Sequence, residues 1–428
     1  FHAAKRRNCF HPNTKLWFRD EAGSWHHDDI RTFVEERLDE ETADSDDFGT
    51  LVQELDGDVF VPSIDEDGNE VVKPVEAVSK HPSPDHMVRV ETRSGREITV
   101  TPDHEMHVFD GELRSKRASE LTEADNLAKP EHLDVVSPDE PKRFDLLEEL
   151  LRCENVDNGR LMVKGLDRDD LYEVFTETLA EDHEGRFYPL KSTAEYLGTT
   201  KKALSNYVYR ESIPAELLIA VFDSVDDLLR RVPNDVRLGM KRDAPDMDRF
   251  IDLNERVATL LGYYAAEGFA REQETPKGTI HQTTICGTEV EARDFFVDVL
   301  REEFGVEPYY ENEAKVTVSG RLLRTFFDTV LDAGVTADSK QVPQVVFDAP
   351  DEIVTSFLSG YFSGDGAVST NATVVSATTV SKELKEDLFA LLTRLGIVAS
   401  VDVTEPGPLV EYFPDYYDVD SPKQSARR

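Results

Sequence analysis

Short apolar runs broken by turn residues fill the first part of the chain. Asp58 to Ile64 and Glu70 to Val78 are β-like runs on either side of an Asp- and Gly-rich turn, which predicts a hairpin. Met87 to Thr92 and Glu97 to Thr101 flank a Ser-Gly turn and predict a second hairpin. We therefore expect residues 9–140 to consist mostly of strands and turns.

Helical spacing of apolar residues follows, so we expect residues 145–250 to be helical. Lys191 to Tyr207 (KSTAEYLGTTKKALSNY) has the pattern of a helix-turn-helix, with two short helices around a glycine. The residues expected to pack these helices together are Ala194, Leu197, Gly198, Leu204 and Tyr207. Two interpretations stay open: the unit binds DNA through Lys201, Lys202 and Arg210, or it serves packing alone.

An approximate internal repeat occupies the remaining part of the chain. Leu260 to Gly268 (LLGYYAAEG) and Leu358 to Gly366 (LSGYFSGDG) are glycine-interrupted apolar segments that end in an acid followed by Gly. Strand-like segments follow each of them, and then a predicted helix, Glu291 to Phe304 or Lys382 to Leu395. Two similar units suggest a pseudo-two-fold arrangement.

The repeated segments place two carboxylates where they could meet. Gly262 and Gly360 let two helices approach closely, because no side chain projects between the backbones. Side-by-side packing would bring Glu267 and Asp365 together at the helix ends. Two such carboxylates can hold Mg²⁺, which activates water and stabilises the leaving oxygen in phosphodiester hydrolysis. Ordinary helix-terminal acids are the alternative, but the repetition of the whole pattern argues against it.

Both segments resemble the LAGLIDADG motif of homing endonucleases. The resemblance continues in Asp338 to Pro343 (DSKQVP) and Ser376 to Ala399 (SATTVSKELKEDLFALLTRLGIVA). It implies an α/β endonuclease in which Glu267 and Asp365 are the metal-binding catalytic acids. It also implies that Lys340 polarises the attacking water or stabilises developing charge. The first motif departs from the family pattern, since Glu267 stands where Asp is usual, and the longer side chain shifts the carboxylate by about an ångström.

Cys9 gains meaning from its surroundings. Cys9 to Trp17 (CFHPNTKLW) resembles the N-terminal splicing block of inteins, and Gly95 to Phe109 (GREITVTPDHEMHVF) resembles their second block, with Thr101 and His104 in its TxxH core. Ala118 to Pro130 (ASELTEADNLAKP) resembles the segment that follows in the all-β Hint fold. An endonuclease repeat inserted downstream is typical of a large intein.

Cysteine suits the first step of protein splicing, because its thiolate is strongly nucleophilic near neutral pH. The thiol of Cys9 would attack the carbonyl carbon of Asn8 and convert the peptide bond into a thioester. The resemblance implies that His104 hydrogen-bonds or protonates the scissile nitrogen and that Thr101 supports the site. His107 lies outside the core match and is interpreted as structural.

Composition alone would argue against a DNA partner. The 428 residues contain 48 Lys and Arg against 87 Asp and Glu, a net charge of −39, whereas phosphate binding favours basic residues. Acids are spread along the whole chain and lysine is scarce, which is typical of a salt-rich cytoplasm, where charges are screened. A halophilic source is therefore expected, and the negative net charge does not exclude DNA as a partner. The three cysteines are too far apart to predict a disulfide framework.

The two ends of the chain suggest a piece of a larger precursor. Phe1 to Asn8 (FHAAKRRN) resembles a segment of the archaeal family-D DNA polymerase large subunit, which would be the host protein. Asp415 to Arg428 lacks the His-Asn ending of an intein, so we expect a C-terminally truncated product, or less readily a split intein. We expect a cytoplasmic monomer whose partners are double-stranded DNA at the intein-free host site and the polymerase exteins.

The predicted fold class is multi-domain: an incomplete all-β Hint region, a helical or helix-turn-helix region and an α/β LAGLIDADG endonuclease. The expected boundaries are 1–8 for the host remnant, 9–140 for the Hint region, 145–250 for the helical region, 251–337 for the first repeat and 338–428 for the second repeat with the truncated end. Two alternatives stay open beside the active homing endonuclease: a non-cutting DNA-binding intein, and a bare fragment of the polymerase precursor.

Overall fold

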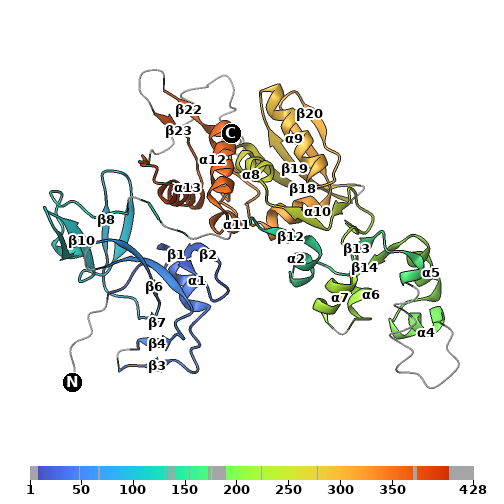
Figure 1. Cartoon of the computed structure of the whole chain (residues 1–428), viewed down its shortest axis with the longest axis horizontal. Helices are drawn as coiled ribbons and strands as arrows, with labels where there is room; N and C mark the ends of the chain where they lie inside the picture. The colour runs from blue at the N-terminus through green and yellow to red at the C-terminus, as the bar shows by residue number, and fades with distance from the viewer. Residues whose placement is uncertain are drawn as a thin grey trace. The chain divides into compact units, whose positions relative to one another are not determined.

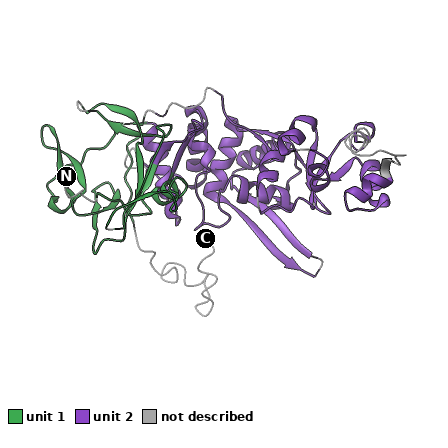
Figure 2. Cartoon of the chain, turned by 90° about the horizontal axis from the view of Figure 1, so that it is seen from below, with its two compact units in different colours: residues 1–16, 28–133, 396–428 green, residues 17–27, 134–395 purple. Residues whose placement is uncertain are grey.

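The computed structural model describes residues 8–403, except 48, 66–67, 131, 134, 136–139, 154, 172–174, 176–188, 223, 277 and 370–373. The predicted host segment before Asn8 and the chain end therefore lie outside the described residues. Figure 2 colours the two compact units into which the chain divides. Unit 1 contains residues 1–16, 28–133 and 396–428, and unit 2 contains residues 17–27 and 134–395. The chain of unit 2 is thus inserted into unit 1.

Unit 1 is built mainly from short antiparallel strands, as the sequence predicts. Its elements are α1 (Ile30–Glu35), β3 (Asp44–Ser45), β4 (Leu51–Glu54), β5 (Phe60–Ile64), β6 (Glu70–Pro74), β7 (Ala77–Lys80), β8 (Val88–Glu91), β9 (Glu97–Val100), β10 (Glu105–Phe109), β11 (Leu113–Arg117) and η1 (Ala118–Glu120). The two predicted hairpins are confirmed as the pairs β5–β6 and β8–β9. The predicted run from Glu70 to Val78 is wrong as a single strand, because β6 stops at Pro74, which has no N–H to continue a ladder. Ala77–Lys80 pairs with β4 instead.

The region from 145 to 250 is mixed rather than helical, and here the prediction is wrong. Its helices are α2 (Leu146–Arg152), α4 (Pro189–Tyr196), α5 (Lys201–Tyr209), α6 (Ala215–Ile219) and α7 (Val225–Arg231). Its strands are β12 (Arg143–Asp145), β13 (Leu161–Lys164), β14 (Ser212–Pro214), β15 (Arg237–Met240), β16 (Met247–Asp248) and β17 (Phe250–Asp252). β13 is buried along most of its length, so its apolar run has no alternation that would distinguish it from a short helix. Partners as distant as β15 decide the matter.

The internal repeat is confirmed in its helices. Each predicted motif lies at the end of a longer helix, α8 (Glu255–Glu267) or α12 (Asp351–Asp365). The predicted second helices are α9 (Val290–Glu302) and α13 (Lys382–Arg394). Both motif helices and both second helices can be followed in Figure 1.

The strands of the two repeats differ in the described part of the chain. The first repeat contains a sheet in the order β18-β19-β21-β20. Its strands are β18 (Gly268–Thr275), β19 (Gly278–Cys286), β20 (Tyr309–Asn312) and β21 (Lys315–Ser319). α10 (Arg321–Thr325), η2 (Phe326–Val330) and α11 (Gln344–Phe347) lead on to α12. Among its described residues, the second repeat shows only the short pair β22 (Ala367–Val368) and β23 (Val375–Ser376).

Helices α8 and α12 lie against each other (Figure 1), and their backbones approach closely at two glycines. A Cβ added at Gly262 would lie 2.0 Å from the carbonyl oxygen of Phe357, and one added at Gly360 would lie 2.1 Å from that of Thr259. Neither backbone could yield to a methyl group. The predicted role of the two glycines is therefore confirmed, and it fixes where both helices end.

A short N-terminal segment belongs to unit 2. Strands β1 (Lys15–Arg19) and β2 (Trp25–Asp29) contain its ends, and Trp17 to His27 groups with the repeat helices. The Trp25 N–H donates to Asp348 Oδ1 at 2.8 Å, and Gln344 Nε2 donates to the Trp25 carbonyl at 3.1 Å. No sequence pattern predicted this, because the contacts join residues more than three hundred positions apart.

Candidate functional sites

The paired acids come together at the ends of α8 and α12. Asp365 is half-buried and Glu267 is more exposed, and a Cβ added at Gly364 in α12 would lie 3.6 Å from Glu267 Cγ. Burial raises the pKa of Glu267. Burial, and then repulsion by Glu267, raises the pKa of Asp365 to about 6. The structure thus holds two carboxylates close enough to repel each other in a partly desolvated seam.

The donor set fits a hard divalent cation. Carboxylate oxygens are the ligands that Mg²⁺ prefers, and Mg²⁺ is commonly held by one or two carboxylates together with water and substrate phosphates. A positive charge between Glu267 and Asp365 would offset the repulsion that raises the pKa of Asp365. Across the residues described here, no cluster of three or more His, Cys, Asp or Glu could complete an all-protein cage. The remaining ligands would therefore be water and phosphate.

Cys286 lies beside this seam and was not predicted. It ends β19, and burial together with the negative charge of Glu267 raises the pKa of its thiol, while Lys315 opposes this shift. The sequence offered no signal for this position, because it follows from the register of β18 and β19. That register pairs Gly268, next to Glu267, with Ile285, next to Cys286.

Lys340 lies in the core rather than at the surface. Its residue is 2% exposed, and its Nζ lies 3.1 Å from the centre of the Tyr264 ring. Within the described residues Nζ has no hydrogen-bond partner. Burial holds the pKa of Lys340 well below its usual range. Tyr264 belongs to α8 and lies three residues before Glu267, so Lys340 contacts the motif helix about one turn before the first acid.

The predicted splicing residues meet at the end of β9. The Cys9 N–H donates to Thr101 Oγ1 at 3.0 Å, and the Thr101 N–H donates to the Cys9 carbonyl at 3.0 Å. The His104 N–H in turn donates to the Thr101 carbonyl at 3.0 Å. Thr101 is 3% exposed, so a buried hydroxyl faces the nitrogen of the Asn8–Cys9 peptide bond. The structure therefore brings all three residues together.

His104 is covered by Phe10, a residue that the sequence did not single out. The two rings make an edge-to-face contact with centres 4.5 Å apart. Nδ1 of His104 is buried and has no hydrogen-bond partner among the described residues. Burial lowers the pKa of His104, while Asp103 and Glu105 oppose this shift. The imidazole is therefore neutral at neutral pH. Residue His107 is exposed on β10.

The helix-turn-helix pattern forms as predicted in α4 and α5. Ala194 and Leu204 are buried between the helices, and Gly198 adopts a φ of +65°, which allows the sharp turn. Lys201 and Lys202 are exposed in the first turn of α5, whereas Arg210 is exposed at its far end. The three cations therefore lie at opposite ends of a nine-residue helix, about 13 Å apart.

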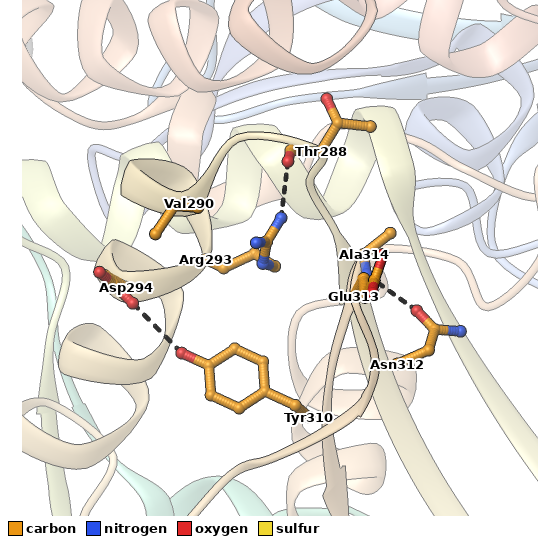
Figure 3. A pocket seen from close by; sticks show the side chains of 8 residues that line it. All are labelled: Thr288, Val290, Arg293, Asp294, Tyr310, Asn312, Glu313 and Ala314. Atoms are coloured by element: carbon orange, nitrogen blue, oxygen red, sulfur yellow. Dashed lines mark hydrogen bonds between the residues drawn. The ribbon is translucent and has the colours of Figure 1, made fainter.

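A shallow cavity of about 760 Å³ lies between α9 and the turn that joins β20 to β21 (Figure 3). Arg293 donates to the Thr288 carbonyl at 2.6 Å, and the Tyr310 hydroxyl donates to Asp294 at 3.2 Å. The guanidinium of Arg293 and the hydroxyl of Tyr310, which line the cavity, are thus already hydrogen-bonded to other groups of the protein. Glu267 and Asp365 are not among the residues that line it.

Comparison with known families gives the class of protein. Residues 352–412 match the LAGLIDADG-like domain family, and this range contains all of α12 except its first residue, and so includes Asp365. A solution NMR structure of the Pab PolII intein shares 30% sequence identity and covers 27% of this chain and 62% of that chain. Its TM-score of 0.25 is too low to support an argument about the fold. The family match supports a LAGLIDADG-like domain in this part of the chain.

The chain is also similar to parts of DNA polymerase II large subunits. The chain is 40% identical over 435 residues to the DNA polymerase II large subunit of Haloquadratum walsbyi, which covers 98% of this chain and 19% of that relative. It is 65% identical over 131 residues to the DNA polymerase II large subunit of Halobacterium salinarum, 30% of this chain and 10% of that relative. The chain therefore spans about a fifth or less of the length of these two relatives. The polymerase context and the halophilic character predicted from the sequence are confirmed.

The length and hydropathy of the helices bear on whether the chain could cross a membrane. Across the described residues, none of the helices is both long and apolar enough to cross a membrane.

Proposed function

We propose that the chain cuts double-stranded DNA at the pair formed by Glu267 and Asp365. The observation that supports this most strongly is the meeting of two carboxylates at the ends of α8 and α12, where burial, and then repulsion by Glu267, raises the pKa of Asp365 to about 6. Two like charges that are partly removed from water destabilise the folded state, and such pairs are typical of functional sites. The LAGLIDADG-like family match, which includes Asp365, supports the same assignment.

The reaction proposed is hydrolysis of a phosphodiester in each DNA strand. A bound Mg²⁺ would supply activation of water and stabilisation of the leaving oxygen. Glu267 and Asp365 would hold it with one or two oxygens each and would orient the scissile phosphate between the helix ends. The side chain of Glu267 is one methylene longer than that of the usual Asp, so its carboxylate extends further from α8. Lys201, Lys202 and Arg210 are the exposed cations that we propose for contacts with the DNA backbone.

A cleavage assay tests this proposal. A supercoiled plasmid carrying the uninterrupted polymerase gene is incubated with the protein and Mg²⁺ over a range of KCl concentrations. We expect linear product from the native chain and none from Asp365→Asn or Glu267→Gln, while Ser363→Ala, an exposed neighbour in α12, retains activity. Binding without cutting, unchanged in Asp365→Asn, would favour the alternative of a non-cutting DNA-binding intein.

We also propose that Cys9 begins protein splicing. Its thiol loses a proton and its sulfur attacks the carbonyl carbon of Asn8. The carbon–nitrogen bond then breaks, and the nitrogen of Cys9 takes up a proton, leaving a thioester and a free amine. Thr101 Oγ1 lies 3.0 Å from that nitrogen and would hold the strained peptide in place. His104 would take up the proton that the Cys9 thiol releases and would donate it to the nitrogen of Cys9.

Thiol-induced cleavage tests the splicing proposal. The chain, and the same chain extended with the coding sequence that follows it in the gene, are treated with dithiothreitol. We expect cleavage between Asn8 and Cys9 in the extended chain, no cleavage in Cys9→Ala, and normal cleavage in Cys153→Ala, which removes another free thiol. Cleavage that survives Cys9→Ala would show that another group is the nucleophile.

The host and the surroundings complete the proposal. The exteins would be the flanking parts of a DNA polymerase II large subunit, the DNA partner would be the intein-free copy of that gene, and the cofactor would be Mg²⁺. We propose that the protein acts as a monomer in the cytoplasm, since the pseudo-two-fold repeat supplies both acids from one chain.

A further inference from the structure

Strand β2 presents one histidine inward and one outward. Trp25 and His27 are buried, whereas His26 between them is partly exposed and pairs with Asp20 at 2.8 Å. This alternation is that of a strand with one buried face. His27 lies among aromatic rings, 5.1 Å from Phe347 and 5.5 Å from Trp17 between ring centres. A polar ring at such a position needs a partner, because an unsatisfied buried group is costly.

The partner of His27 is a buried carboxylate on a repeat helix. His27 Nδ1 lies 3.1 Å from Asp387 Oδ1, and Asp387 on α13 is 4% exposed. The other carboxylate oxygen, Oδ2, accepts the backbone N–H of Val342 at 3.2 Å. Asp387 thus connects the N-terminal segment to the stretch that carries Lys340.

The backbone around Lys340 is fixed on both sides. Ser381 Oγ donates to the Lys340 carbonyl at 2.5 Å and caps α13 by accepting the Leu384 N–H at 3.1 Å. Gln341 Nε2 donates to the Asp332 carbonyl at 2.7 Å. With Asp387 holding Val342, three successive residues are tied to surrounding structure. The Lys340 side chain then extends to the face of Tyr264, one turn before Glu267 on α8.

We propose that His27 is a positioning residue of the nuclease unit: it orients Asp387, which with Ser381 fixes the backbone on either side of Gln341 and thereby sets where Lys340 meets Tyr264. A segment that lies within the splicing half of the sequence is therefore part of the nuclease framework. The consequence for DNA cleavage rests on the function proposed for Glu267 and Asp365, whereas the positioning itself does not.

Hydrogen exchange on the whole chain, followed by mass spectrometry in concentrated KCl, tests the positioning without DNA. We expect His27→Ala to speed exchange at residues 338–345 about tenfold, the factor that corresponds to one lost buried hydrogen bond. His26→Ala is the matched control, since it changes the outward histidine of the same strand, and we expect it to leave that stretch unchanged. Reductive methylation of the Lys340 amine should likewise be faster in His27→Ala only.

A pair of size-retaining variants covers the case in which His27→Ala unfolds and all segments exchange faster. His27→Asn places an N–H where Nδ1 stood, and we expect it to restore protection at residues 338–345. His27→Gln carries its N–H one bond further out, and we expect it to leave that stretch unprotected.

Two results would overturn the inference: unchanged exchange at residues 338–345 in a folded His27→Ala, or equal protection by the Asn and Gln variants. Plasmid cleavage by the native chain is measured in parallel. A native chain that cuts no DNA refutes the proposed function and leaves the exchange result to decide the positioning.

Discussion

The side-chain amine of Lys340 is buried, whereas the sequence resemblance implied that it acts on the attacking water. Its Nζ lies on the ring of Tyr264 and, within the described chain, accepts and donates no hydrogen bond. The pKa of Lys340 is lowered well below its usual range because burial penalises the charged form. The buried amine contacts the motif helix at Tyr264, so its influence on the acids passes through α8.

Lys340→Met should stabilise unit 2 at neutral pH. The folded pKa is lowered, so the native lysine must release a proton on folding, and stability is lost as pH falls from about 10.5 through the folded pKa. Removing an unpartnered buried amine should raise the free energy of unfolding by about 1–3 kcal/mol at pH 7. Denaturant titrations at pH 7 and pH 10 measure this gain, which should shrink at the higher pH. A loss of stability at pH 7 would show that the amine has a favourable partner.

Phe10→Ala should raise the pKa of His104. The ring of Phe10 contacts that of His104, and burial is the main cause of the lowered pKa of this histidine. An NMR titration of the native chain should give a midpoint below about 6.5, the ordinary value for histidine, and the variant should titrate nearer to it. Because the native folded pKa is lowered, unit 1 should lose stability as pH falls from about 6.5 through that pKa. Leu113→Ala, a change to an exposed apolar residue in β11, is the control and should not move the midpoint.

Contact between two helices is the element on which the nuclease site depends. Gly262 and Gly360 allow α8 and α12 to meet backbone to backbone, which sets the separation of the acids at their ends. The sheet of the first repeat continues directly from α8, since β18 begins at Gly268. A displacement of either helix would therefore move one carboxylate relative to the other.

Gly262→Ala should destabilise unit 2 and abolish cleavage together. The added methyl would lie 2.0 Å from the Phe357 carbonyl oxygen, which cannot yield because it is backbone. Forcing extra atoms into such a contact costs about 1–3 kcal/mol and moves the helices apart. Thermal unfolding and plasmid cleavage measure the two effects. Ser359→Ala, an exposed neighbour of Gly360, should change neither, and an active Gly262→Ala would mean that the helices tolerate separation.

Local patterns predicted the elements that repeat, and missed those that depend on distant partners. The motif helices, the two hairpins and the pair formed by α4 and α5 follow from spacing and turn residues. The strands β13 and β15 were missed because each is a short buried run whose identity depends on a partner about seventy residues away. The same reason hides the attachment of His27 to Asp387 and the burial of Lys340. The roles proposed for Cys9, Glu267 and Asp365 could be predicted from the sequence because their motifs are local.

At the scale of the whole molecule, the net charge of −39 opposes compactness and DNA binding alike. The relatives from Haloquadratum walsbyi and Halobacterium salinarum agree with a protein adapted to salt. Screening shortens the range of charge repulsion to about 3 Å at 1 M salt. Local cations such as Lys201 could then act without the field of the distant acids.

Thermal stability should therefore rise with KCl. Between about 0.1 M and 1 M the screening length falls from about 10 Å to 3 Å, so repulsion among the surface acids should weaken strongly. Melting followed by circular dichroism in a KCl series, with sucrose at equal osmolality as the control for solvent exclusion, measures the effect. An unchanged melting temperature across the KCl series would contradict the assignment of the acidity to salt adaptation.

We propose that one chain joins a splicing element to an endonuclease, and that the endonuclease recognises the insertion site in a host gene that lacks this sequence. The most direct measurement incubates the protein with Mg²⁺ and two plasmids, one with the uninterrupted polymerase gene and one with the gene interrupted by this sequence. The account predicts a double-strand cut at the insertion point of the uninterrupted gene alone, lost in Asp365→Asn. Cutting of both plasmids alike, or of neither at any KCl concentration, would contradict it.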